Sequence, residues 1–418
     1  MAASGEDAHP DRMRLIVTLV ASLGALMAQP AESDIFERAR RSVVLVETES
    51  GHGSGFLVDA RGLILTNDHV LGSSPYLAVG LDPERKYRAV VLARDASLDL
   101  AVIRVNPRAM EGVRPLTFAD GASLKVGARV LAIGSALTDA GAVLTTGIVS
   151  RLGAGKVIAD LNVNPGSSGG PLLDLNGEVV GICTYFQKAA AGPGLAGVVP
   201  AQLATGLIAR AGQSLSEPPS FDRLPVASPT PYPAAALRER AIAVDPGAYG
   251  KTIGGMRLDV LTPPVVYREA HEADIKTGRH WSGYSWQAYT GQVEALVGLR
   301  VVSRTHPIDE KPVRFVNSVR SVRLLRNGVE VVPIVPGRFC DRAIAPREAR
   351  QFEGCLAFYQ YAPEVFAPGG ALQIEVYSDG ARGKPRRWNL PPSLITRVWA
   401  DFEPWLAALP CPPPCRGR

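Results

Sequence analysis

The sequence predicts an all-β protein rich in turns, and three observations support this fold class. Short runs of apolar or alternating residues recur along the chain and are separated by Gly, Pro, Asn and Asp. Glycine and proline are abundant, at 42 and 34 of 418 residues, and runs with helical periodicity are few. This spacing favours an antiparallel barrel or sandwich over alternating strands and helices, and the length allows two domains.

The first half of the chain is expected to consist almost entirely of strands. A Gly-rich turn over residues 51–55 and a hairpin turn over residues 59–62 separate the first of them, and a segment with helical spacing, residues 200–211, closes the first domain. The predicted strands cover residues 42–48, 56–58, 63–66, 87–93 and 98–105, and further short strands continue to residue 199.

A second domain is expected after residues 213–235, whose serine and proline content is typical of a linker. Asn327-Gly328 lies between two alternating runs and predicts a β-hairpin with a type I′ turn. We therefore expect residues 236–418 to form a β-rich accessory domain with a C-terminal helix. The expected elements are strands at residues 256–266, 293–302, 319–324, 329–332 and 372–377, and a helix carrying Leu394, Val398, Phe402 and Trp405 that is limited by Pro404.

The N-terminal segment has the features of a secretory signal peptide. Arg12 and Arg14 precede an apolar run over residues 15–27, which is shorter than the roughly 20 residues that a membrane-spanning helix needs. We expect residues 1–31 to be a signal peptide, with Met13 as a second candidate start, and the protein to be exported and therefore periplasmic or secreted. A buried N-terminal helix and an uncleaved anchor are the alternatives, and membrane contact is expected only for the anchor.

Four of the five cysteines are candidates for disulfide bonds, which fits an exported protein. Cys340 and Cys355 flank one short loop, and Cys411 and Cys415 enclose three prolines. The second pair could instead bind a metal ion, but no histidine stands nearby, so no metal site is expected. Cys183 lies within an apolar run and is expected to be a small residue of the core.

The chain is mildly basic, with a formal net charge of +5 and a pI near 9.0. Neither a block of lysine and arginine nor an aromatic RNA-binding motif accompanies this charge. An ordinary solvated surface explains it, so a nucleic-acid partner is not expected.

Residues 164–171, Asn-Pro-Gly-Ser-Ser-Gly-Gly-Pro, place two serines between glycines just before an apolar run. Glycine lets the backbone adopt positive φ and approach a ligand closely, so such a turn can aim several backbone N–H groups at one point. A nucleophile with an oxyanion hole requires this arrangement. A tight turn between two strands is the alternative.

A serine nucleophile needs a general base and a group that orients the base. His69 follows a predicted strand at a turn, where a rigid scaffold can present its side chain, while His52 lies in a Gly-rich loop and is the weaker candidate. Asp99 leads into the apolar run 100–103, and Asp95 in the preceding turn competes with it as the orienting carboxylate. A histidine at a strand end also occurs in purely structural roles.

Three segments together resemble the trypsin-like serine proteases, in particular the HtrA/Deg family. They are residues 66–70 (Thr-Asn-Asp-His-Val), residues 99–102 (Asp-Leu-Ala-Val) and residues 164–171. Their order His, Asp, Ser is also that of chymotrypsin. The resemblance covers roughly residues 35–212 and implies two packed six-stranded antiparallel β-barrels with the site between them. We accordingly assign residues 32–212 to a trypsin-like serine protease domain.

The resemblance also implies the roles of single residues and the reaction. Ser168 would be the nucleophile, His69 the general acid and base, and Asp99 the orienting carboxylate, with the backbone N–H groups of Gly166 and Ser168 as the oxyanion hole. The reaction would be hydrolysis of protein or peptide substrates through an acyl-enzyme, and neither a metal ion nor an organic cofactor is implied. A catalytically idle scaffold that acts through the C-terminal domain is the alternative.

The chain departs from the family in its second domain and in two loops. No PDZ-like carboxylate-binding loop follows residue 212, residues 150–160 are fewer than is usual in the family, and no long insertion precedes His69. Recognition of peptide tails by a PDZ domain, the family's regulation and its oligomers therefore do not carry over. The oligomeric state stays open.

The expected substrate pocket lies just before the nucleophile. Asn162 stands six residues before Ser168, where a trypsin-like enzyme that cleaves after Lys or Arg has an acidic residue. Asn162 is uncharged, and Val163, Tyr185 and Phe186 are expected to line the same pocket. We therefore expect a preference for small or medium apolar residues at P1, the residue before the cleaved bond.

Overall fold

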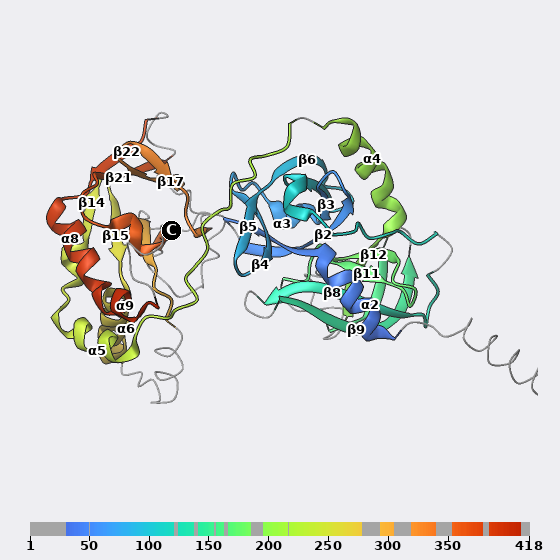
Figure 1. Ribbon diagram of the computed structural model, residues 1–418, viewed down its shortest axis with the longest axis horizontal. Coiled ribbons are helices and arrows are strands. Elements are labelled where there is room, and N and C mark those ends of the chain that lie inside the picture. Colours follow the sequence, from blue (N-terminus) through green and yellow to red (C-terminus); the bar gives the residue numbers. More distant parts are fainter. Residues whose placement is uncertain are drawn as a thin grey trace, which may run out of the picture. The chain divides into compact units, whose positions relative to one another are not determined.

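The computed structural model divides into two compact units, each built mainly from strands (Figure 1). The first unit holds the described parts of residues 1–45, 53–69 and 91–217, and the second holds those of residues 46–52, 70–90 and 218–418. The structure describes residues 31–410 except residues 50, 121–123, 138–140, 154–155, 163–165, 185–194, 216, 278–292, 305–318, 340–352 and 379–383.

The first sheet contains seven strands: β1 (Val43–Thr48), β2 (Gly51–Asp59), β3 (Leu63–Thr66), β4 (Leu77–Asp82), β5 (Arg85–Arg88), β6 (Val90–Asp95) and β7 (Leu100–Arg104). Their order is β5-β4-β1-β2-β3-β7-β6. The two edge strands, β5 and β6, are separated in sequence by Ala89 alone, so one bent run of chain supplies both edges. The sheet is open, so the first of the two implied six-stranded barrels is observed as a seven-stranded half-barrel.

The next six strands are β8 (Arg129–Leu137), β9 (Gly141–Gly153), β10 (Lys156–Asp160), β11 (Pro171–Leu173), β12 (Val179–Thr184) and β13 (Leu195–Pro200). They form a closed barrel in the order β10-β13-β12-β11-β8-β9. All six neighbouring pairs are antiparallel. Closure leaves this barrel without an exposed edge strand, and it confirms the predicted all-β class.

One apolar cluster joins the two sheets within the first unit. Phe56, Leu65 and Val102 of the first sheet pack in the same buried cluster as Leu131 and Ile182 of the barrel. Helices α2 (Glu32–Ala39) and α4 (Thr205–Gln213) each bury two residues on this cluster. With η3 (Ala201–Ala204), α4 confirms the helix predicted near residues 200–211, and the other short helices are η1 (Arg40–Ser42), α3 (Asp68–Leu71) and η2 (Pro107–Met110).

The second unit adds two further antiparallel sheets, in the orders β14-β15-β16-β20-β19 and β18-β17-β21-β22. Trp405, Tyr361, Phe366 and Phe402 belong to a large buried cluster of this unit. The strands are β14 (Gly250–Ile253), β15 (Met256–Leu261), β16 (Val297–Arg304), β17 (Val319–Arg326), β18 (Val329–Val331), β19 (Val335–Phe339), β20 (Glu353–Tyr361), β21 (Leu372–Ser378) and β22 (Arg386–Asn389). The helices are α5 (Ala234–Ala243), η4 (Pro246–Tyr249), α6 (Pro263–Thr277), η5 (Pro363–Phe366), α8 (Pro392–Asp401) and α9 (Glu403–Ala408).

Local sequence signals in the second unit were mostly reliable. Strands β17 and β18 pair with Arg326 opposite Val329, and the two residues between them have positive φ, 51° at Asn327 and 81° at Gly328. This is the predicted type I′ hairpin. The terminal helix is also present, although it divides into α8 and α9 at Phe402, before Pro404.

The strand predicted over residues 256–266 is partly wrong. Strand β15 ends at Leu261, and the remaining residues begin helix α6, which starts at Pro263. Proline is favoured in the first turn of a helix because its missing N–H has no intrahelical partner there. Helix α5, whose N-cap residue is Pro233, was not predicted either.

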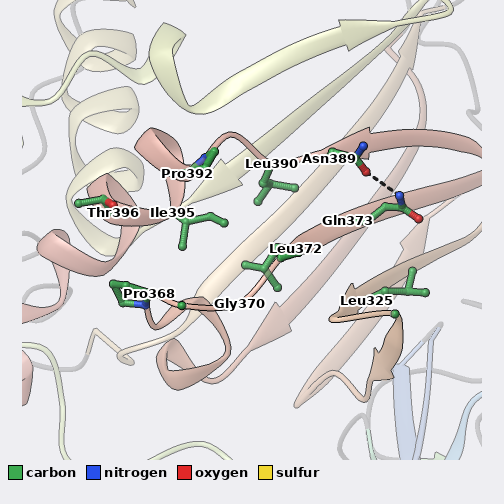
Figure 2. Close-up of a pocket in the computed structure, with 13 residues that line it drawn as sticks. Leu325, Pro368, Gly370, Leu372, Gln373, Asn389, Leu390, Pro392, Ile395 and Thr396 are labelled. Atoms are coloured by element: carbon green, nitrogen blue, oxygen red, sulfur yellow. Dashed lines mark hydrogen bonds between the residues drawn. The ribbon is translucent and has the colours of Figure 1, made fainter.

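A cavity of about 650 Å³ lies in the second unit beside β21, β22 and α8 (Figure 2). Its wall is mainly apolar, and Leu372, Leu390 and Ile395 face it, while Gln373 donates a hydrogen bond to Asn389 at its rim. All of its lining residues belong to the second unit, and none is a predicted site residue. Within the described residues, no helix combines the length and the hydropathy needed to cross a membrane.

Candidate active site

Strand pairing brings His69 and Asp99 together. Strands β3 and β7 are antiparallel, with Thr66 opposite Ala101. The chain leaving β3 therefore lies beside the chain entering β7. His69 follows β3 in the single turn of α3, and Asp99 immediately precedes β7, so both predicted residues stand at one end of this strand pair.

The carboxylate of Asp99 holds the imidazole and the backbone of His69. His69 Nδ1 lies 2.8 Å from Asp99 Oδ2 and 2.9 Å from Oδ1, and the His69 backbone N–H donates to Oδ1 at 3.0 Å. Because Nδ1 faces the carboxylate, the neutral ring carries its proton there, and Nε2 is left with its lone pair directed away from Asp99. This is the tautomer that a general base requires.

The charge of Asp99 is maintained by its hydrogen bonds. Partial burial raises the pKa of Asp99, but the side chain and backbone N–H of His69 and the hydroxyl of Thr184 lower it by more, so its pKa lies below the ordinary value. Asp99 is therefore ionised at neutral pH and can stabilise an imidazolium on His69.

The backbone of Asp99 is strained and is held by a neighbour. Its φ of 56° lies in the left-handed region, which costs a non-glycine residue roughly 1–2 kcal/mol. Asn67, which is fully buried, donates from Nδ2 to the carbonyl oxygen of Asp99 at 2.8 Å. Strained backbone persists where the surrounding structure over-determines it, and it is concentrated at functional sites.

Thr184, at the end of β12, supplies a further contact to the carboxylate. Its hydroxyl donates to Asp99 Oδ2 at 2.8 Å. The preceding residue, Cys183, accepts a hydrogen bond from Gly169 N at 2.8 Å. Consecutive residues of β12 thus contact the orienting carboxylate and the residue that follows Ser168.

The loop around Ser168 is fixed by backbone hydrogen bonds. Gly170 N donates to Ser167 O at 3.1 Å, and Cys183 N donates to Gly170 O at 2.9 Å. The C=O and N–H of a trans peptide point in opposite directions. Since the Ser167 carbonyl turns towards Gly170, the N–H of Ser168 in the same peptide points to the opposite side. Glycine is required nearby, because Gly166 has φ 99°.

Two hydrogen bonds of the Ser54 backbone connect this loop to the segment of His69. The backbone N–H of Ser54 donates to Ser168 O at 2.7 Å, and Ser54 O accepts from Thr66 Oγ1 at 2.7 Å. Thr66 lies three residues before His69. The loop of Ser168 is therefore tied to both of the segments that carry His69 and Asp99.

The competing candidates have other surroundings. Asp95 accepts hydrogen bonds from Ser97 and from Leu98 N and so caps its own turn. His52 is exposed on β2. The contacts of Asp95 within its own turn favour Asp99 over it as the orienting carboxylate, and the contact with Asp99 distinguishes His69 from His52.

The remaining predicted residues are only partly described. Asn162 is exposed and follows β10, while Val163, Tyr185 and Phe186 lie outside the described residues. Cys340, Cys411, Cys415 and the side chain of Cys355 also lie outside them. Cys183 is buried in the barrel core as expected, and burial raises the pKa of its thiol to about 12. Among the described residues, no group of three His, Cys, Asp or Glu is arranged to hold a metal ion.

The contacts of Thr184, Asn67 and Ser54 were not foreseen from the sequence. Asn67 stands inside a segment that resembles the family, and Ser54 stands in the Gly-rich turn over residues 51–55, but neither residue type indicates a partner so far along the chain. Ser54 stands directly between two glycines, Gly53 and Gly55, and this is the one visible feature that could have drawn attention to it.

Comparison with known proteins identifies the family of this part of the chain. Residues 53–182 match the family model of the trypsin-like peptidase domain. A probable periplasmic serine endoprotease DegP-like of Chlamydia pneumoniae is 35% identical over 170 residues, which cover 38% of this chain and 34% of the relative. A protein of the same description from Bartonella henselae is 37% identical over 165 residues, covering 37% and 32%. Residues 53–182 form a trypsin-like peptidase domain of the HtrA/Deg type.

The matched range contains His69, Asp99 and Ser168 in that order. Of this range, only residues 70–90 belong to the second unit, and His52 lies just before its start. The chain spans about a third of the length of these curated relatives. The crystal structure of the serine endoprotease from Yersinia pestis is 28% identical, with a TM-score of 0.40, and the match covers 44% of this chain and 68% of that one.

Proposed function

We propose that the protein is a serine endopeptidase whose catalytic residues are Ser168, His69 and Asp99. The observation that carries this proposal is the contact of His69 Nδ1 with a carboxylate that also accepts from Thr184. A structural histidine does not need an ionised partner that fixes its tautomer, whereas a general base does.

The arrangement supports acyl transfer in two halves. In the first, Ser168 Oγ attacks the peptide carbonyl carbon while His69 Nε2 takes the hydroxyl proton, and the carbonyl π electrons move to oxygen. The backbone N–H groups of Ser168 and Gly166 stabilise that oxyanion. His69 then gives its proton to the leaving amine, and an ester remains on Ser168.

The second half repeats these steps with water. His69 takes a proton from the water as it attacks the ester, and returns it to Ser168 Oγ when the acid product leaves. Asp99 stays ionised throughout and stabilises the imidazolium.

The proposed substrates are proteins or peptides of the cell envelope. Relatives with a similar domain are described as periplasmic serine endoproteases, which supports an exported protein. Asn162 is exposed and uncharged, so we extend the proposal to small or medium apolar residues at P1. The proposed domains are a signal peptide (1–31), the protease (32–212), a linker (213–235) and an accessory domain (236–418).

Hydrolysis of casein by the full chain tests the proposed function. Wild type is expected to cleave casein, and Ser168→Ala is expected to lose the activity by several orders of magnitude. Ser167→Ala is the matched control, because it removes a neighbouring hydroxyl of the same loop and should remain active. Equal activity of Ser168→Ala and wild type contradicts the proposal, and a folded wild type that neither cleaves nor reacts at Ser168 supports a scaffold instead.

A digest of a peptide library tests the specificity separately. The proposal expects Ala, Val and other small or medium apolar residues before the cleaved bonds. Predominant cleavage after Lys or Arg contradicts it.

A further inference from the structure

Ser54 on β2 has more contacts with the nucleophile loop than its place in the chain suggests. It is completely buried, although it lies 112 residues before Gly166. Its hydroxyl contacts the Gly166 carbonyl oxygen at 2.7 Å and the backbone nitrogen of Ser135 at 2.7 Å. Its own backbone N–H donates to Ser168 O at 2.7 Å.

The directions of the two hydroxyl contacts follow from the groups involved. The backbone N–H of Ser135 can only donate, so Ser54 Oγ accepts from it. The carbonyl of Gly166 can only accept, so the single hydroxyl proton of Ser54 is directed to it. One buried hydroxyl therefore links β8 to the loop, because it accepts a hydrogen bond from one and donates a hydrogen bond to the other. No aliphatic side chain can make these two hydrogen bonds.

These contacts anchor two peptide planes on either side of the nucleophile. The Ser54 hydroxyl holds the carbonyl of Gly166, and its backbone N–H holds the carbonyl of Ser168. The peptide between these two planes carries the N–H of Ser168, and its carbonyl is held by Gly170. All three successive carbonyls of the loop are thus engaged, which fixes the direction of that N–H.

The packing around Ser54 leaves the loop little freedom to adopt another shape. A Cβ atom on Gly169 would lie 2.1 Å from Ser54 O and 2.4 Å from Thr66 Oγ1. A Cβ atom on Gly134 would lie 2.9 Å from the Cα of Ser167. Real Cβ atoms do not approach other heavy atoms this closely, so glycine is needed at both positions for β2, β8 and the loop to pack together.

We propose that Ser54 is a positioning residue that holds the Gly166–Ser168 loop in the shape of an oxyanion hole. The inference rests on the proposed function and deepens it, because it assigns the brace that keeps the hole formed. Ser54 touches neither substrate nor His69 in this role and acts through Gly166 and Ser168.

The test compares Ser54→Ala with Ser42→Ala in the full chain. Ser42 is the matched control, because it is also buried and its hydroxyl donates to a backbone carbonyl, that of Arg114, at 2.7 Å. Each variant loses one buried hydroxyl, but only Ser54→Ala loosens the loop. Ser54→Cys, whose thiol is a weak donor and acceptor of similar size, serves as a second variant if Ser54→Ala does not fold.

Kinetics with a peptide substrate and a peptide boronic acid give the first readout. Removing an oxyanion donor itself costs about 10²–10³ in kcat, so loosening its support should cost Ser54→Ala about tenfold to about 100-fold, with KM little changed. The boronate adduct places an anionic oxygen in the hole, so its affinity should fall in parallel. The pH at which activity is half-maximal should not move, because the His69–Asp99 contact is untouched.

Hydrogen exchange gives a second readout that does not depend on activity. The N–H of Gly169 donates to Cys183 O on β12 and that of Gly170 donates to Ser167 O, and both should exchange faster in Ser54→Ala than in Ser42→Ala. The inference is overturned if Ser54→Ala and Ser42→Ala have the same kcat, the same boronate affinity and the same exchange rates at Gly169 and Gly170. If wild type itself hydrolyses nothing and does not bind the boronate, the proposed function fails, and exchange at Gly169 and Gly170 alone decides whether Ser54 positions the loop.

Discussion

Replacing Thr184 by valine probes how much the orienting carboxylate depends on its third hydrogen bond. Valine keeps the branched shape of threonine but removes the hydroxyl that donates to Asp99 Oδ2 at 2.8 Å. A hydrogen bond to a charged group contributes about 1.5–3 kcal/mol. The side chain of Asp99 is 32% exposed, so water can replace part of this contribution and the lower half of the range applies.

The expected loss of kcat/KM follows from these values. With about 1.4 kcal/mol for each factor of ten, Thr184→Val should reduce kcat/KM by about tenfold to about 40-fold. Hydrolysis of a fluorogenic peptide at saturating and limiting substrate measures it. Thr184→Ser, which keeps the hydroxyl, should retain most of the activity.

The same substitution has a consequence for acid stability. The pKa of Asp99 is lowered in the folded protein, so its stabilising contribution is present above about pH 4, the ordinary range of an aspartate, and is lost as the pH falls through the lowered folded value. Thr184→Val removes one of the hydrogen bonds that lower this pKa. Its unfolding by acid should therefore begin at a higher pH than that of wild type or Thr184→Ser. Wild-type kcat/KM in folded Thr184→Val would refute this role of Thr184.

Two further substitutions test the loop and the second unit. Gly169 has φ 88°, and a Cβ atom there would lie 2.1 Å from Ser54 O, so Gly169→Ala should lower both the melting temperature and the activity. Gly112 has φ 75° with open space around it. Gly112→Ala should therefore lower the free energy of unfolding in urea only by the roughly 1–2 kcal/mol that left-handed backbone costs. Equal destabilisation of the two would contradict the packing described around the loop. Burial raises the pKa of Asp401, so its contribution to stability is fully present below about pH 4 and is lost as the pH rises through the folded value. Asp401→Asn cannot ionise and should gain stability relative to wild type as the pH rises above 4; a constant difference in the free energy of unfolding between pH 4 and 7 would argue against a raised pKa.

Local signals made parts of the fold predictable. The Asn327-Gly328 hairpin depends on the φ preferences of two adjacent residues, and these do not change with tertiary context. Helix α6 was missed because Val265 and Val266 extend the apolar run of β15, so composition alone suggested that the strand continues. Its starting signal, Pro263, was present but is shared by many turns.

The site shows the same division between local and distant information. His69 and Asp99 could be proposed because each stands at the end of a recognisable strand. The partners that fix them could not, since Thr184 lies 85 residues from Asp99 and Asn67 lies 32 residues from it. Such contacts depend on strand order and barrel closure, and these cannot be predicted from the local pattern of a single sequence. Likewise, no sequence motif predicts the cavity of the second unit.

The central claim is that Ser168 is a nucleophile activated by His69, and covalent labelling tests it most directly. Wild type treated with a fluorophosphonate should gain one phosphonyl group, and tryptic mass spectrometry should map it to Ser168 and not to its neighbour Ser167. His69→Ala, with the same loop but without the base, should react far more slowly. A folded wild type that remains unlabelled, or that is labelled at Ser167, would contradict the account.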